Sequence, residues 1–141
     1  MRERSTVLLL HGGPGSFDHS YFMPDFARLA EVAQVVYLDL PGHGRSDHGD
    51  AESWTFESCA DGVRDLCEAV GLEHPVVYGH SLGGMVAMVL AARHPELPGA
   101  LVLQSARGGS TSPRSSRSCA GSAGTRWPRP RRASTAAKAS R

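Results

Sequence analysis

The stretch Val76–Gly83 constrains the fold of this chain more than any other part of the sequence. An apolar, β-branched run, Val76-Val77-Tyr78, leads directly into the motif Gly-His-Ser-Leu-Gly. A run of small and apolar residues that favour helix follows, from Leu82 to Ala92. A Gly-x-Ser-x-Gly motif indicates a catalytic serine when it lies between a strand and a helix, joined by a tight turn.

The spacing within this motif has a chemical reason. A serine hydroxyl is a poor nucleophile unless it projects from the sheet and is held beside a base. A sharp turn produces that projection, and Gly79 and Gly83 lack the Cβ atoms that would keep strand and helix apart. At the start of a helix, the free N–H of Leu82 can face a developing oxyanion. We therefore expect Ser81 to be a nucleophile; the alternative is an ordinary glycine-containing turn before a buried helix.

Strand and helix patterns alternate along the chain. Continuous apolar runs predict four buried strands, at residues 6–10, 34–40, 76–80 and 100–104. Helical patterns predict three helices, at residues 20–31, 55–70 and 82–94. We expect Thr55 to cap the second helix and Gly71 to end it. The alternation predicts an α/β fold with a parallel sheet of about four strands.

Two further loops follow predicted strands: His11-Gly12-Gly13-Pro14-Gly15, and the turn-rich segment Asp39–Asp47. A glycine-rich turn can direct backbone amides outward at the carboxyl end of a strand, where α/β sheets bind ligands. With Gly79–Gly83, these blocks make residues 5–106 resemble the N-terminal half of an α/β-hydrolase-fold serine hydrolase. His-Gly-Gly-Pro-Gly is similar to the proline iminopeptidase (prolyl aminopeptidase) branch. The other two blocks look more like general esterases, lipases and C–C hydrolases.

The resemblance implies a three-layer α/β/α fold and a reaction. The reaction is acyl transfer to water through an acyl-enzyme, on an ester or an N-terminal peptide bond of a small molecule or peptide. Ser81 would be the nucleophile, and the N–H groups of Gly13 and Leu82 would form the oxyanion hole. His11 and Gly12 would only shape their turn. We expect no cofactor and no metal, because the sequence has no phosphate-binding loop, dinucleotide fingerprint or metal-ligand cluster.

The resemblance also implies parts that this sequence does not supply. Family members begin with an antiparallel strand pair and continue well beyond the fourth strand found here, and that continuation carries the lid, the triad acid and the triad histidine. After Ser81 the only acid is Glu96 and the only histidine is His94. We therefore expect the triad acid and base to be absent and turnover to be negligible. Asp39 and Asp47 are expected to shape their loop.

Charge divides the chain at residue 107. Residues 1–106 carry all fourteen acidic residues and six arginines, whereas residues 107–141 carry eight arginines, one lysine and no acid. We expect 1–106 to be a partial hydrolase domain and 107–141 to be a disordered tail. A reading-frame change would produce such a tail. Alternatively, the chain is a non-catalytic binding protein whose basic tail contacts nucleic acid or anionic partners.

The longest apolar run, Met85–Ala92, is too short to cross a bilayer, and Val7–Leu10 is too short for a signal peptide. We therefore expect a cytoplasmic protein without membrane contact. Nucleic-acid binding is the less favoured partner prediction. The strands at 34–40 and 100–104 would form the two open edges of the sheet, which predicts poor solubility.

Overall fold

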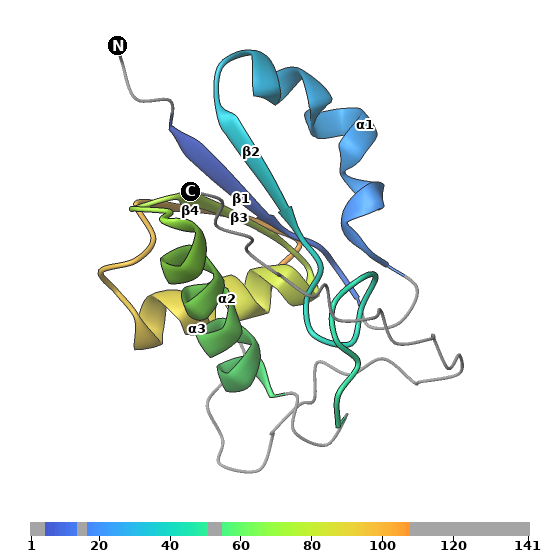
Figure 1. Ribbon diagram of the computed structural model, residues 1–141, viewed down its shortest axis with the longest axis vertical. Coiled ribbons are helices and arrows are strands. Elements are labelled where there is room, and N and C mark those ends of the chain that lie inside the picture. Colours follow the sequence, from blue (N-terminus) through green and yellow to red (C-terminus); the bar gives the residue numbers. More distant parts are fainter. Residues whose placement is uncertain (1–4, 14–16, 51–54, 108–141) are drawn as a thin grey trace, which may run out of the picture.

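Four parallel strands form a single sheet in the computed structural model of the chain, in the order β2-β1-β3-β4 (Figure 1). The structure describes residues 5–13, 17–50 and 55–107. The strands are β1 (Thr6–Leu10), β2 (Gln34–Leu38), β3 (Val76–His80) and β4 (Ala100–Gln104). In the central register, Leu8 lies between Val36 of β2 and Val77 of β3. The predicted α/β fold with a four-stranded parallel sheet is confirmed.

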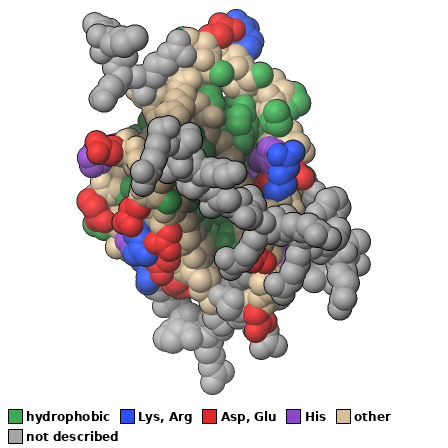
Figure 2. All heavy atoms as spheres, in the orientation of Figure 1, with side chains coloured by type: hydrophobic (Ala, Val, Ile, Leu, Met, Phe, Trp, Pro, Cys, Tyr) green, Lys and Arg blue, Asp and Glu red, His purple; other side chains and the backbone are tan. Residues whose placement is uncertain are grey.

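Helix α2 (Phe56–Val70) begins and ends at the residues that the sequence indicates. The Thr55 hydroxyl accepts from the Ser58 N–H, and the Ser58 hydroxyl accepts in return from the Thr55 N–H, so this pair forms a capping box. Gly71 ends the helix in the left-handed region, at φ 69°. Acidic residues recur along α2, at Glu57, Asp61, Asp65 and Glu68. Figure 2 shows acidic side chains gathered at the surface over this helix.

Helices α2 and α3 (Leu82–Arg93) cover the same face of the sheet, where the main core lies. Successive strand residues point to opposite faces, so every second residue of β1 and β3 meets these helices. The core side chains from strands and helices are almost fully buried: Leu8, Leu10, Val63, Val77, Val86 and Leu90. Burying such side chains is the main favourable term in folding.

Three short helical pieces cover the opposite face: η1 (His19–Tyr21), α1 (Met23–Phe26) and η2 (Ala27–Glu31). The prediction of one continuous helix at 20–31 is therefore wrong. Pro24 lies in the first turn of α1 and has no N–H, so helical hydrogen bonding cannot run through it from η1. Aromatic packing holds these pieces in place, because Phe22 and Phe26 both contact Tyr78 of β3 edge-on.

Strand β2 ends at Leu38, two residues before the predicted end. Asp39 and Leu40 enter the following loop and are both buried there. Because the four strands are parallel, their carboxyl ends all lie at one end of the sheet. This loop, the turn after β1 and the start of α3 therefore lie together at that end. Among the described residues, no helix has the length and apolarity that a membrane crossing requires. All of the predicted tail except Arg107 lies outside the described residues.

Candidate active site

Ser81 lies at a strained corner between β3 and α3. Its backbone has φ 49° and ψ −109°, a conformation that residues with a side chain rarely adopt. The Ser81 N–H donates to the carbonyl oxygen of Gln104 at 2.9 Å, and the Ser81 carbonyl oxygen accepts from the Met85 N–H at 3.1 Å. The residue is only partly buried. Such strain costs about 1–3 kcal/mol and is most often found at functional sites.

The two glycines of the motif are needed because backbone segments approach closely there. A Cβ on Gly83 would collide with the carbonyl group of Leu10 and would lie 2.6 Å from the carbonyl oxygen of His11. A Cβ on Gly79 would lie 2.6 Å from the carbonyl oxygen of Gly83. The first turn of α3 is therefore pressed against the carboxyl end of the central strand β1. The positive φ falls on Ser81 and not on the glycines.

The predicted oxyanion-hole amides, those of Gly13 and Leu82, come from adjacent segments. Leu82 is the first residue of α3, so its N–H has no acceptor within the helix. A Cβ on Gly13 would lie 2.9 Å from the Leu82 side chain and 3.1 Å from Nε2 of His43. Within the described part of the chain, the Gly13 N–H donates no backbone hydrogen bond. Neither amide therefore has a backbone acceptor among the described residues.

His11 connects the turn after β1 to the loop after β2. The Leu40 N–H donates to Nε2 of His11 at 3.0 Å, and Nδ1 lies 2.5 Å from the carbonyl oxygen of Gly12. Since Nε2 accepts, the ring proton lies on Nδ1, which donates to Gly12. Burial lowers the pKa of His11, and its side chain is fully buried. A neutral His11 therefore fixes the turn that presents Gly13, a shaping role without chemistry of its own.

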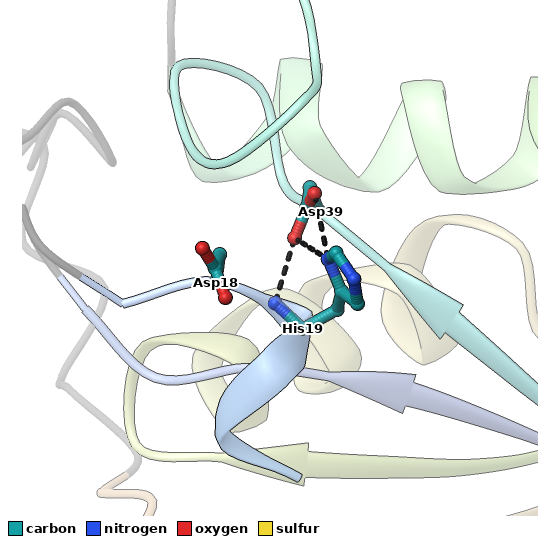
Figure 3. Close-up of side chains that lie close together, drawn as sticks. All are labelled: Asp18, His19 and Asp39. Carbon is teal, nitrogen blue, oxygen red and sulfur yellow. Dashed lines mark hydrogen bonds and ion pairs between the residues drawn. The ribbon is translucent and has the colours of Figure 1, made fainter. Parts of the chain in front are cut away.

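Asp39 anchors the loop after β2 to η1 (Figure 3). One carboxylate oxygen accepts from the backbone N–H of His19 at 2.7 Å, and both oxygens lie 2.9 Å from Nδ1 of that ring. The other oxygen accepts from the Arg45 N–H at 2.9 Å. Burial raises the pKa of Asp39, but these hydrogen bonds outweigh it and hold the pKa below its ordinary value. Gly44, at φ 50°, packs directly against this carboxylate.

Asp18, His19 and Asp39 lie close enough to hold a metal ion. However, both oxygens of Asp39 are already engaged by N–H donors. One oxygen of Asp18 accepts from the backbone N–H and the hydroxyl of Ser20, where Asp18 caps η1. A cation would have to displace these donors, so the cluster acts as a structural anchor. The sequence predicts a loop-shaping role for Asp39 but does not indicate its partner, His19.

Within the described residues, no histidine or carboxylate makes a hydrogen bond with the Ser81 hydroxyl. The ring of His80 stacks on Tyr21, with ring centroids 6.0 Å apart, and packs against Gly12.

His94 caps the C-terminal end of α3, and this end lies about 18 Å from the end at which Ser81 is found. Nε2 of His94 lies 2.8 Å from the Asp61 carboxylate. Hydrogen bonds from Arg93 and His94 lower the pKa of Asp61 to about 2. This ion-pair cluster belongs to the opposite end of the helix from Ser81. It therefore cannot act as an acid–base pair for Ser81.

Similar proteins of known sequence include hydrolases. An uncharacterised protein of Mycobacterium tuberculosis is 40% identical over 103 residues, which cover 72% of this chain and 29% of that protein. RutD of Escherichia coli, a putative carbamate hydrolase, is 38% identical over 89 residues, which cover 63% of this chain and 33% of RutD. The chain thus spans about a third of the length of these curated relatives.

Solved structures with the same fold include an esterase and a lactonase. A thermophilic esterase from Thermogutta terrifontis superposes with a TM-score of 0.71 at 31% identity, covering 79% of this chain and 40% of the esterase. AidH, an N-acyl homoserine lactonase, gives a TM-score of 0.66 at 31% identity, covering 74% of this chain and 38% of AidH. The family model for the alpha/beta hydrolase fold matches residues 5–138. This chain therefore belongs to the α/β-hydrolase fold family.

Proposed function

We propose that this chain carries the nucleophile and oxyanion hole of a serine hydrolase. Ser81 would attack an acyl carbonyl to form an acyl-enzyme, and the N–H groups of Gly13 and Leu82 would stabilise the oxyanion. The strained corner at Ser81 is the observation that carries this proposal. It presents a partly exposed hydroxyl at the start of a helix, next to two amides that have no backbone acceptor in the described residues.

The names of the relatives favour an ester or related acyl bond as the substrate. The similar structures are those of an esterase and a homoserine lactonase, and RutD is a putative carbamate hydrolase. All three bond types present a carbonyl that a serine can attack. The alternative substrate bond is an N-terminal peptide bond, and its only support is the sequence His-Gly-Gly-Pro-Gly. The last two residues of that sequence lie outside the described ranges.

We further propose that the chain by itself turns over substrate very slowly. Without a base, the Ser81 hydroxyl stays protonated and its nucleophilicity is low. Loss of triad members costs several powers of ten in rate, and the residual acceleration comes from the oxyanion hole and substrate binding. The groups assigned in this proposal, Ser81 and the amides of Gly13 and Leu82, would supply only this residual acceleration.

Labelling with a fluorophosphonate tests both proposals. We expect slow modification of Ser81 in the full chain, and acceleration when imidazole is added, because imidazole replaces the missing base. Peptide mass spectrometry should place the adduct on Ser81 and leave the exposed Ser58 unmodified. The variant S81A should lose the imidazole-dependent adduct.

Two results would count against these proposals, each against a different one. Fast, saturable labelling without imidazole would show that a base is present and would overturn the expected inactivity. Equal labelling of Ser58 and Ser81 at all imidazole concentrations would show that the corner does not activate its serine, which would overturn the nucleophile assignment.

A further inference from the structure

Two buried histidines, His11 and His43, lie beside the turn that carries Gly13. They are 0% and 1% exposed, and their ring centroids are 5.0 Å apart. His11 begins this turn directly after β1, and His43 belongs to the loop after β2. A Cβ on Gly13 would lie 3.1 Å from Nε2 of His43. The turn therefore lies next to two rings that can each take up a proton near neutral pH.

Hydrogen bonds define where the protons of both rings lie. Nδ1 of His11 donates to the Gly12 carbonyl oxygen, and Nε2 accepts from the Leu40 N–H at 3.0 Å. Nδ1 of His43 lies 3.0 Å from the Pro41 carbonyl oxygen, which can only accept, so this nitrogen carries a proton. Only a neutral His11 can donate through one ring nitrogen and accept through the other.

Protonation of His11 would break the hydrogen bond that joins the two loops. The added proton would lie on Nε2 and would face the Leu40 N–H, so that two donors would meet. Both residues are fully buried, and the Leu40 N–H would lose its acceptor, at the cost of its full desolvation. The loop after β2 would then no longer be held to the turn after β1.

The groups around His11 together disfavour a cation there. Burial has the largest effect on the pKa of His11 and lowers it, and His43 lowers it further. The hydrogen bond to Gly12 and the charges of Asp39 and Asp18 raise the pKa, but the balance lies below the ordinary value of 6.5. The first turn of α3 carries no charged side chain. The other titratable groups on the elements packed around this turn are His19, Arg45 and His80.

We propose that His11 is a positioning residue for the oxyanion hole and that it acts only as a neutral ring, so that mild acid disables the site. In neutral solution the ring joins the two loops and keeps Gly13 against the Leu82 side chain. In acid, the turn after β1 separates from the loop after β2, and the Gly13 N–H leaves its place beside Leu82. The loss of reactivity rests on the function proposed for Ser81, whereas the loss of folding stability does not.

Urea denaturation of the full chain at two pH values tests the proton dependence. His11→Gln removes the titrating group, and its side-chain oxygen can take the place of Nε2 and accept from the Leu40 N–H. Because the folded-state pKa of His11 is lowered, its stabilisation is present above pH 6.5 and is lost as the pH falls below that value. From about pH 7.5 to about pH 5.5, the unfolding constant of the wild type should rise severalfold relative to that of H11Q. One group with an ordinary pKa of 6.5 allows about tenfold at most.

Fluorophosphonate labelling at a fixed imidazole concentration tests the consequence for the site. The rate for the wild type is divided by the rate for H11Q at each pH, because titration of the imidazole affects both proteins equally. This ratio should fall severalfold between the same two pH values. If neither protein forms an adduct at Ser81, the proposed function fails and the catalytic part of this inference fails with it. The urea comparison decides the acid sensitivity separately.

His48→Gln is the matched control. His48 is an exposed histidine that follows His43 in the same loop, and its Nδ1 lies 3.0 Å from the Ser46 carbonyl oxygen. H48Q should keep the wild-type pH dependence in both measurements. If H11Q does not fold, H11N takes its place, since asparagine can still donate to the Gly12 carbonyl. Equal pH dependence in the wild type and the His11 variant would overturn the proposal. So would a wild type whose unfolding constant does not rise between the two pH values.

Discussion

Replacing Gly83 with alanine should unfold the chain or destabilise it by about 4 kcal/mol or more. The added methyl group would collide with the carbonyl group of Leu10, and it would lie 2.6 Å from the carbonyl oxygen of His11. Both obstacles are backbone atoms at the end of the central strand, so no side chain can rotate away to make room. A small domain has only about 5–15 kcal/mol of stability in total.

Gly62→Ala is the matched control for this change. Gly62 lies within α2, and a Cβ there would meet no atom within 4 Å. The control should raise stability by about 1 kcal/mol, because alanine favours helix more than glycine does. Urea denaturation followed by far-ultraviolet circular dichroism measures both variants. If the two variants differ by less than about 1 kcal/mol, α3 is not pressed against β1 as described.

Replacing Asp39 with alanine should cost about 3 kcal/mol of stability. The carboxylate accepts hydrogen bonds from the backbone N–H groups of His19 and Arg45, and its removal would leave both donors without an acceptor. The wild-type contribution depends on pH with a defined sign. Because the folded-state pKa is below the ordinary value near 3.8, this stabilisation is present above that value and is lost as the pH falls further.

Asp47→Ala is the control, since Asp47 lies in the same loop and is exposed. Among the described residues, its side chain accepts a hydrogen bond only from the Gly49 N–H, at 3.0 Å, so its loss should cost less than about 1 kcal/mol. Denaturant titrations near pH 7 should separate the two variants by about 2 kcal/mol. Equal costs would mean that Asp39 does not hold the loop to η1. The difference should disappear in acid strong enough to protonate Asp39.

The sequence predicted the sheet and its main helix well, because the signals there are local. Continuous apolar runs mark buried parallel strands, and Thr55 and Gly71 mark the ends of α2 by capping chemistry that needs no distant partner. The segment 20–31 was less predictable. Its apolar spacing indicates helix, but Pro24 and the packing of Phe22 and Phe26 on Tyr78 give three short pieces instead.

The candidate site was only partly predictable for a related reason. The spacing of the motif indicates the corner at Ser81, because the close approach of strand and helix requires glycine at defined positions. The hydrogen bonds between loops cannot be found in this way. The bonds between His11 and Leu40 and between Asp39 and His19 join residues that are 20 or more positions apart in the sequence. No local pattern indicates which of these polar groups will meet. The function of Ser81 and the boundary at residue 107 remain predictions.

The strained corner at Ser81 is the geometry from which the proposed chemistry follows, and two substitutions measure it directly. At ordinary positions glycine is less stable than alanine by about 0.5–1 kcal/mol, because it gains more freedom on unfolding. At φ 49° and ψ −109° the order should reverse, since glycine adopts this conformation without strain. We expect S81G to be more stable than S81A, with a free energy of unfolding about 1 kcal/mol higher. An S81A protein as stable as S81G, or more stable, would contradict the corner and with it the nucleophile assigned to this chain.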